Sequence, residues 1–153
     1  MGRMKDILIT LGLSMLPISE LRGAIPYGLS KSIPFNTVFL ISVLGNLLPV
    51  IPLYFFLENL LKFFEKFNWG VKFNNWLISR TKSKSQIIEI YKTIGLLIFV
   101  GIPLPMTGAW TGTIASIIFQ LKFKNFLIGI IGGVLIAAII VSSITLGVRN
   151  FLL

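Results

Sequence analysis

The chain contains neither cysteine nor histidine. Their absence excludes disulfides, thiol chemistry, metal sites built on imidazole and histidine proton relays. Any proton carrier inside the protein must then be a carboxylate, and we expect no metal site and no cofactor. General acid–base catalysis also loses its commonest residues, so we expect that the protein is not an enzyme.

Charged residues are also scarce, at 12% of the chain, whereas 55% of the residues are hydrophobic and the mean hydropathy is +0.91. A soluble domain of 153 residues cannot bury that much apolar surface. The composition predicts an all-α, multi-pass protein of the cell (inner or plasma) membrane. The 14 lysines and arginines outnumber the five acidic residues and fall mainly between apolar runs. We therefore expect contact with anionic membrane lipids and no binding of nucleic acid.

Four hydrophobic regions, at residues 7–29, 35–57, 93–119 and 126–148, form two pairs. They predict a single membrane domain over residues 1–153, with a first repeat at about 5–57 and a second at about 93–149. The connection between them, residues 58–92, interleaves aromatics with seven lysines and arginines. This pattern is typical of an amphipathic, interfacial segment on the cytoplasmic side.

The first region places two opposite charges among helix breakers. Glu20 and Arg22 would each cost about 2.5 to 3.5 kcal/mol at the centre of a continuous membrane helix. A re-entrant hairpin avoids this cost, because a half-membrane helix at residues 7–16 would turn at residues 17–23 and return. The residues that we assign to this hairpin turn are Pro17, Gly23, Pro26 and Gly28.

The third region repeats the first without its charges. Its expected turn residues are Pro103, Pro105, Gly108 and Gly112. Phe35 and Gly45 have the same spacing as Phe123 and Gly133, so the long helices align at an offset of 88 residues, and the two Gly-Ala pairs align at 85. Two inverted repeats, each a re-entrant hairpin followed by a transmembrane helix, are predicted. Complete spans in place of the hairpins remain an alternative, because both topologies put the basic connection in the cytoplasm.

The long helices carry residues suited to close packing. Asn46, Pro49 and Pro52 predict a kink in the second region. In the fourth region, small residues recur at steps of four, which lets another helix approach closely. We expect this stripe to pack on a helix of the first half, with a homodimer as the alternative. The helix-packing residues that we predict are Asn46, Gly129, Gly133 and Ala137.

Two ordered motifs suggest a family. The run from Glu20 to Pro26 reads Glu-Leu-Arg-Gly-Ala-Ile-Pro, and the run from Pro103 to Gly112 reads Pro-Leu-Pro-Met-Thr-Gly-Ala-Trp-Thr-Gly. Together they resemble the small multidrug export proteins, a family similar to the DedA or VTT-domain superfamily of lipid transporters and scramblases. The resemblance implies paired re-entrant hairpins, transmembrane helices and a transport role. The uncharged second hairpin departs from the DedA pattern.

These residues suggest a proton-coupled secondary transporter whose site lies between the two hairpin turns. Glu20 would carry the proton, and Arg22 would hold the phosphate of a small amphiphilic substrate or anionic lipid. Thr107 and Thr111 would offer hydroxyls, and Trp110 a flat wall. Two alternatives remain open: efflux of cationic lipophilic drugs, and a membrane scaffold that transports nothing and uses the charges to fix its register.

Overall fold

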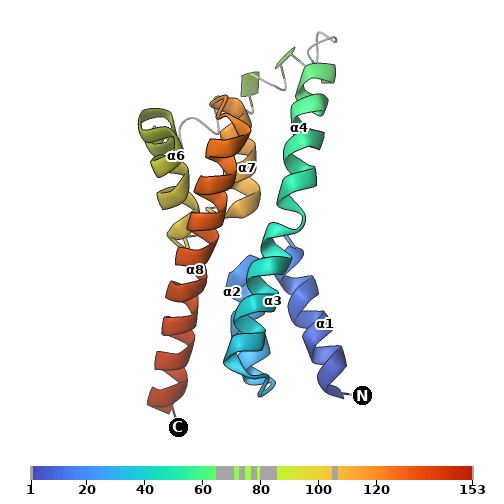
Figure 1. Cartoon of the computed structure of the whole chain (residues 1–153), viewed down its shortest axis with the longest axis vertical. Helices are drawn as coiled ribbons and strands as arrows, with labels where there is room; N and C mark the ends of the chain where they lie inside the picture. The colour runs from blue at the N-terminus through green and yellow to red at the C-terminus, as the bar shows by residue number, and fades with distance from the viewer. Residues whose placement is uncertain are drawn as a thin grey trace.

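A computed structural model describes residues 2–64, 71–72, 75–76, 79, 86–104 and 107–152. All the regular secondary structure in these residues is helical, as the sequence predicted (Figure 1). The helices are α1 (Gly2–Met15), α2 (Glu20–Ser30), α3 (Phe35–Leu47), α4 (Val50–Phe64), α6 (Gln86–Gly101), α7 (Ala109–Ile118) and α8 (Phe123–Leu152). In the predicted connection at residues 58–92, residues 65–70, 73–74, 77–78 and 80–85 lie outside the described residues.

Within the described residues, two apolar stretches are long enough to cross a membrane, Phe35–Leu60 and Phe123–Arg149, with mean hydropathies of 2.1 and 2.7. The other helices are shorter: α1, α2, α6 and α7 have 14, 11, 16 and 10 residues. At about 1.5 Å per residue, none of these four reaches the roughly 30 Å of a hydrocarbon core. The lengths and the apolar composition are those of a membrane protein.

The first long stretch is broken between α3 and α4, at Leu48 and Pro49. Pro49 has no N–H to continue the hydrogen-bond ladder of α3, and its carbonyl accepts from Leu53 N at 3.0 Å in the first turn of α4. Pro52 is the third residue of α4, where an N–H has no partner within the helix, so it causes no second break. The predicted kink is confirmed at Pro49.

The four short helices form two helical hairpins. The α1–α2 pair is joined by residues 16–19 and packs on α3, and the α6–α7 pair packs on α8. In Figure 1 the first pair occupies one half of the long axis and the second pair the other, and their turns meet near the middle.

The two halves share a local turn. Ser32 after α2 and Gln120 after α7 are non-glycine residues with left-handed backbone, at φ values of 56° and 52°. In each turn the next residue donates its N–H to the carbonyl five residues back, at 3.3 Å in the first half and 2.8 Å in the second. This is the pattern of a Schellman C-cap. The two turns lie 88 residues apart, the offset at which the long helices align.

The predicted bounds of the first hairpin turn, residues 17–23, are wrong, because the turn is shorter. The turn covers residues 16–19 and contains Pro17, whereas Gly23, Pro26 and Gly28 lie inside α2. Gly28 is needed for packing instead, because a Cβ there would lie only 2.8 Å from a methyl group of Val38. Pro26 breaks one bond of the helix without ending it.

The second hairpin has a similar correction. Pro103 follows α6 and Gly108 immediately precedes α7, but Gly112 lies inside α7, where a Cβ would be 2.6 Å from Val100 Cγ2. Pro105 lies outside the described residues. The two Gly-Ala pairs that align in the sequence thus lie in different structural positions, since Gly23 is inside a helix and Gly108 precedes one.

The small-residue stripe of α8 makes intramolecular contacts, and its two glycines have a different partner from the one expected. A Cβ on Gly129 would lie 2.9 Å from Leu96 Cδ2, and one on Gly133 would lie 2.6 Å from Val100 Cβ. Both neighbours belong to α6, so the two glycines pack within their own half, whereas Ala137 lines a cavity together with Asn46 of α3, a helix of the first half as expected. The first half has an equivalent contact at Gly45, where a Cβ would be 3.1 Å from the carbonyl oxygen of Leu11 in α1.

Candidate functional site

The turn between α1 and α2 directs one acidic side chain into the protein. Glu20 is the first residue of α2, has left-handed backbone with φ 44°, and is only 7% exposed. Its N–H donates to the carbonyl of Leu16 at 3.0 Å, and the Ser19 hydroxyl donates to the carbonyl of Leu13. Left-handed backbone at a non-glycine residue costs about 1 to 3 kcal/mol and is concentrated at functional sites.

The carboxylate of Glu20 meets the beginning of α7. Its Oε1 accepts the backbone N–H of Trp110 at 3.4 Å, and Ala109 N–H also contacts the carboxylate. The first N–H groups of a helix lack partners within it and attract negative charge, so Glu20 caps α7 from the other half of the chain. A Cβ on Gly108 would lie 2.6 Å from Glu20 Cδ, so this contact requires glycine at position 108.

Arg22 also reaches the other half. One of its terminal nitrogens, Nη2, donates to the backbone carbonyl of Thr107 and lies 3.4 Å from Thr107 Oγ1. Its Nη1 and Nε atoms donate to no protein group in the described part of the chain. The Thr107 hydroxyl is held within its own turn, donating to the carbonyl of Ile102 at 2.7 Å.

In a third contact the side chain comes from the second half and the backbone group from the first. Trp110 Nε1 donates to the carbonyl of Met15, the last residue of α1, at 3.1 Å. The hydroxyl of Thr111 donates to the carbonyl of Gly108 at 3.3 Å and so bonds within its own half. We call residues 15–22 the first tip, and the described residues 102–104 and 107–111 the second tip.

The two charged side chains are not paired with each other. Glu20 bonds to the start of α7 and Arg22 to Thr107, and no ion pair joins them among the residues described. Side chains two positions apart on a helix point to different sides, which explains the separation. The structure therefore brings Glu20, Arg22, Thr107 and Trp110 together, and each charge holds the opposite tip.

Asn46 belongs to the same place, although its sequence position suggested only helix packing. It is 1% exposed, and its Oδ1 atom has no hydrogen-bond partner among the residues that the structure describes. A cavity of about 10 Å³, room for one water molecule, separates it from the tips. The cavity is lined by Glu20, Leu21, Arg22, Asn46, Val100, Ala109, Val134 and Ala137. An amide inside an otherwise apolar span was the signal that pointed to this position.

The comparisons with known proteins agree with the two motifs in the sequence. A family model described as "Putative small multi-drug export protein" matches residues 20–140. The match begins at Glu20 and includes Arg22, Asn46 and the second tip. No curated protein and no solved structure matches the chain.

Proposed function

The chain belongs to the small multi-drug export protein family, and on this premise we propose that it is a proton-coupled secondary transporter of a small anionic amphiphile. The substrate site lies between the two tips. The observation that carries this proposal is the reciprocal bonding of the tips: Glu20 and Arg22 bind the backbone of the second tip, and Trp110 binds that of the first.

The membrane arrangement is an inverted pair of re-entrant hairpins, α1–α2 and α6–α7. Each helix of these pairs is too short to cross the hydrocarbon core, and the turns meet near the middle of the long axis. In many transporters the ends of such half-helices meet at the membrane midplane and form the substrate site. At the first tip Glu20 is buried, and Asn46 of α3 and Ala137 of α8 line the cavity beside it, whereas Leu16 and Ile18 of the turn are exposed.

Glu20 couples protons to the opening of the site. As a carboxylate it stabilises the closed contact, because negative charge is favourable at the start of α7. A proton on Glu20 removes that charge and weakens the bond between the tips. Hydrogen bonds to charged groups contribute about 1.5 to 3 kcal/mol, which is enough to shift a closed state toward an open one.

Arg22 recognises the substrate. Its Nη1 and Nε atoms are free of protein partners among the described residues, and a forked contact with two phosphate oxygens would use one of them together with Nη2. A bound phosphate would compete with the carbonyl of Thr107 for the guanidinium. Anion binding and protonation of Glu20 therefore both loosen the tips, which links the movement of the substrate to that of the proton.

Export of a cationic lipophilic drug is the second candidate. It is favoured by the family description and by the absence of an ion pair between Glu20 and Arg22, since a carboxylate not paired with an arginine could hold a cation. Arg22 lies beside the same cavity and would repel such a substrate, so the anionic amphiphile is preferred.

Proton flux into proteoliposomes containing a pH-sensitive dye tests the function. Dodecyl phosphate as the anionic probe is expected to cause flux in the natural protein, and Glu20→Gln is expected to abolish it. Asp6→Asn is the matched control, because it changes an acid of α1 outside the tips. Normal flux in Glu20→Gln would exclude the proton-carrier role. Flux with tetraphenylphosphonium alone would favour cationic drugs, and no flux with either probe would favour the scaffold.

Cysteine labelling tests the hairpins. Single cysteines at the exposed positions Gly2, Ser32 and Gln120 are unambiguous because the chain has no native cysteine. Re-entrant hairpins place the first two positions on one side of the membrane and Gln120 on the other. Complete spans would instead place Ser32 and Gln120 together, opposite Gly2, so a membrane-impermeant maleimide distinguishes the two arrangements.

A further inference from the structure

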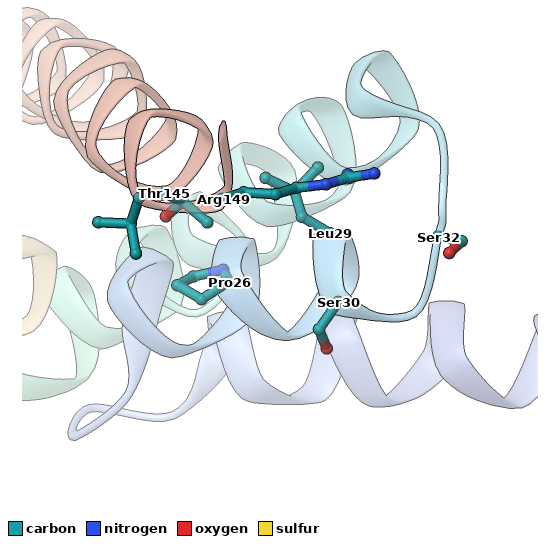
Figure 2. Close-up of a pocket in the computed structure, with 7 residues that line it drawn as sticks. Pro26, Leu29, Ser30, Ser32, Thr145 and Arg149 are labelled. Carbon is teal, nitrogen blue, oxygen red and sulfur yellow. The ribbon is translucent and has the colours of Figure 1, made fainter. Parts of the chain in front are cut away.

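A groove lies far from the tips, where α2 and α8 end side by side (Figure 2). It has a volume of about 330 Å³, within the range of small-molecule sites. One wall is apolar and consists of Pro26, Leu29 and Val148. The polar part contains Arg149 and the hydroxyls of Ser30, Ser32 and Thr145.

Among the described residues, two of the four polar groups donate hydrogen bonds within their own helices and two do not. Ser30 and Thr145 each donate a hydrogen bond of 2.7 Å to a carbonyl of their own helix. Arg149 and the Ser32 hydroxyl bond to no protein group within the described residues. In Figure 2 the guanidinium of Arg149 extends over Leu29 in the direction of Ser32. The C-cap turn fixes Ser32 in place, since its N–H donates to Leu29 at 3.2 Å.

The surroundings of the groove are cationic. The start of α1, the turn after α2 and the end of α8 lie at the same end of the molecule (Figure 1). They bring Arg3, Lys5 and Lys31 to the end that carries Arg149, against one acid, Asp6. Asp6 is already an acceptor for the Tyr27 hydroxyl, at 3.2 Å. The free donors of Arg149 and Ser32 thus lie in a region of positive charge, which attracts anions.

We propose that this groove binds the phosphate of an anionic phospholipid, with Arg149 and Ser32 as donors and an acyl chain along Pro26, Leu29 and Val148. The Phe123–Arg149 stretch has 27 residues, about 40 Å of helix, so Arg149 at its end reaches the headgroup level. A guanidinium at that level forms charge-assisted hydrogen bonds with the phosphate of a headgroup. The apolar wall favours a lipid over a soluble anion. This site is independent of the transport site.

Native mass spectrometry tests the proposal, with dioleoylphosphatidylglycerol titrated into the delipidated full chain in detergent. Arg149→Gln is expected to weaken lipid binding by about tenfold, the effect of losing a charge-assisted contact. Ser32→Ala is expected to weaken it by about threefold. Lys124→Gln is the matched control, because it removes an exposed cation near the other end of α8 and should leave binding unchanged.

Equal binding by Arg149→Gln and the natural chain would overturn the site, and so would equal weakening by Lys124→Gln. Displacement of the lipid by millimolar inorganic phosphate would show that the groove takes a soluble anion, against the proposal. Equal binding of dioleoylphosphatidylcholine would show that the groove does not distinguish an anionic headgroup from a zwitterionic one, which would also overturn the proposal. Arg149→Lys keeps the charge without the fork and is expected to bind with intermediate affinity, which separates loss of the site from loss of folding.

Discussion

The two tips have similar helical frames and opposite chemistry. The first carries Glu20 and Arg22, and the second has no charge among its described residues and offers backbone groups instead. The Gly-Ala pairs align at an offset of 85 residues, but at 88, the offset of the long helices and of the two C-cap turns, the counterpart of Glu20 is Gly108, and these two residues are in contact. Counterparts that touch lie where the two halves meet, so there is space for only one of the two side chains. The contact explains why position 108 of the second tip carries no side chain.

The same asymmetry recurs one layer away from the tips. Asn46 and Val134 are counterparts at the offset of 88, and both line the small cavity beside Glu20. The first half again supplies the polar group, and the second half an apolar wall. The two halves therefore share an arrangement of helices, but among the described residues only the first half supplies polar side chains to the cavity. Substitutions at counterpart positions should have unequal effects.

The largest effect is expected from Gly108→Ala. A Cβ at this position would lie 2.6 Å from Glu20 Cδ, so the carboxylate must leave the start of α7. Because the carboxylate is the far end of a flexible side chain, it can move away, and the cost is then that of its lost bonds, about 1.5 to 3 kcal/mol for a charged group. We expect a loss of about 1.5 to 3 kcal/mol in the free energy of unfolding, measured by titration with SDS in mixed micelles.

Glu20→Ala provides the control for this contact. If Gly108→Ala acts by displacing the Glu20 carboxylate, its cost should fall by more than about 1 kcal/mol when Glu20 is already alanine, since residues in contact are not additive. Additive costs would mean that the two residues do not interact, and the interpretation of the tips as counterparts would fail.

Composition and periodicity predicted the all-helical membrane fold, the kink before α4 and the offset of the long helices. The turn of the first hairpin was placed too far along the chain, because glycine and proline were interpreted as breakers. Gly28 and Gly112 instead allow close approach of Val38 and Val100, which is a tertiary requirement. A glycine inside a helix and a glycine in a turn cannot be distinguished without the neighbouring helix.

The residues of the candidate site could be predicted from the sequence, but their hydrogen-bond partners could not. Glu20 and Arg22 were identifiable because charge is costly inside a membrane segment. Their partners were not, because Arg22 bonds to the carbonyl of Thr107 and Glu20 to the N–H of Trp110. Backbone groups are present at every residue, so side-chain chemistry does not indicate which of them is used. Asn46 was assigned to packing for a similar reason.

A smaller effect, of opposite sign, is expected from Asn46→Leu. The buried Oδ1 atom has no protein partner in the described part of the chain, and such an atom costs about 1 to 3 kcal/mol. Its replacement by an apolar side chain of similar size should raise the free energy of unfolding by up to that amount and should reduce transport of dodecyl phosphate. Val134→Leu, at the counterpart position, should give no comparable gain in stability because it removes no polar atom. A destabilised Asn46→Leu protein would indicate that the amide is satisfied.

The smallest effect is expected from Trp110→Phe, which removes the bond from Nε1 to the carbonyl of Met15 and keeps an aromatic ring. A neutral hydrogen bond contributes about 0.5 to 1.5 kcal/mol, so the loss of stability should fall in that range. Tyr27→Phe is the matched control, because it removes the bond of 3.2 Å to Asp6 within the first hairpin. Hydrogen exchange of the backbone amide at position 110 should accelerate in Trp110→Phe and not in Tyr27→Phe, since only the former bond joins the two tips. Equal acceleration in both variants would mean that the tips open through general loosening of the hairpins, and the bond from Trp110 would then have no special part in closing the site.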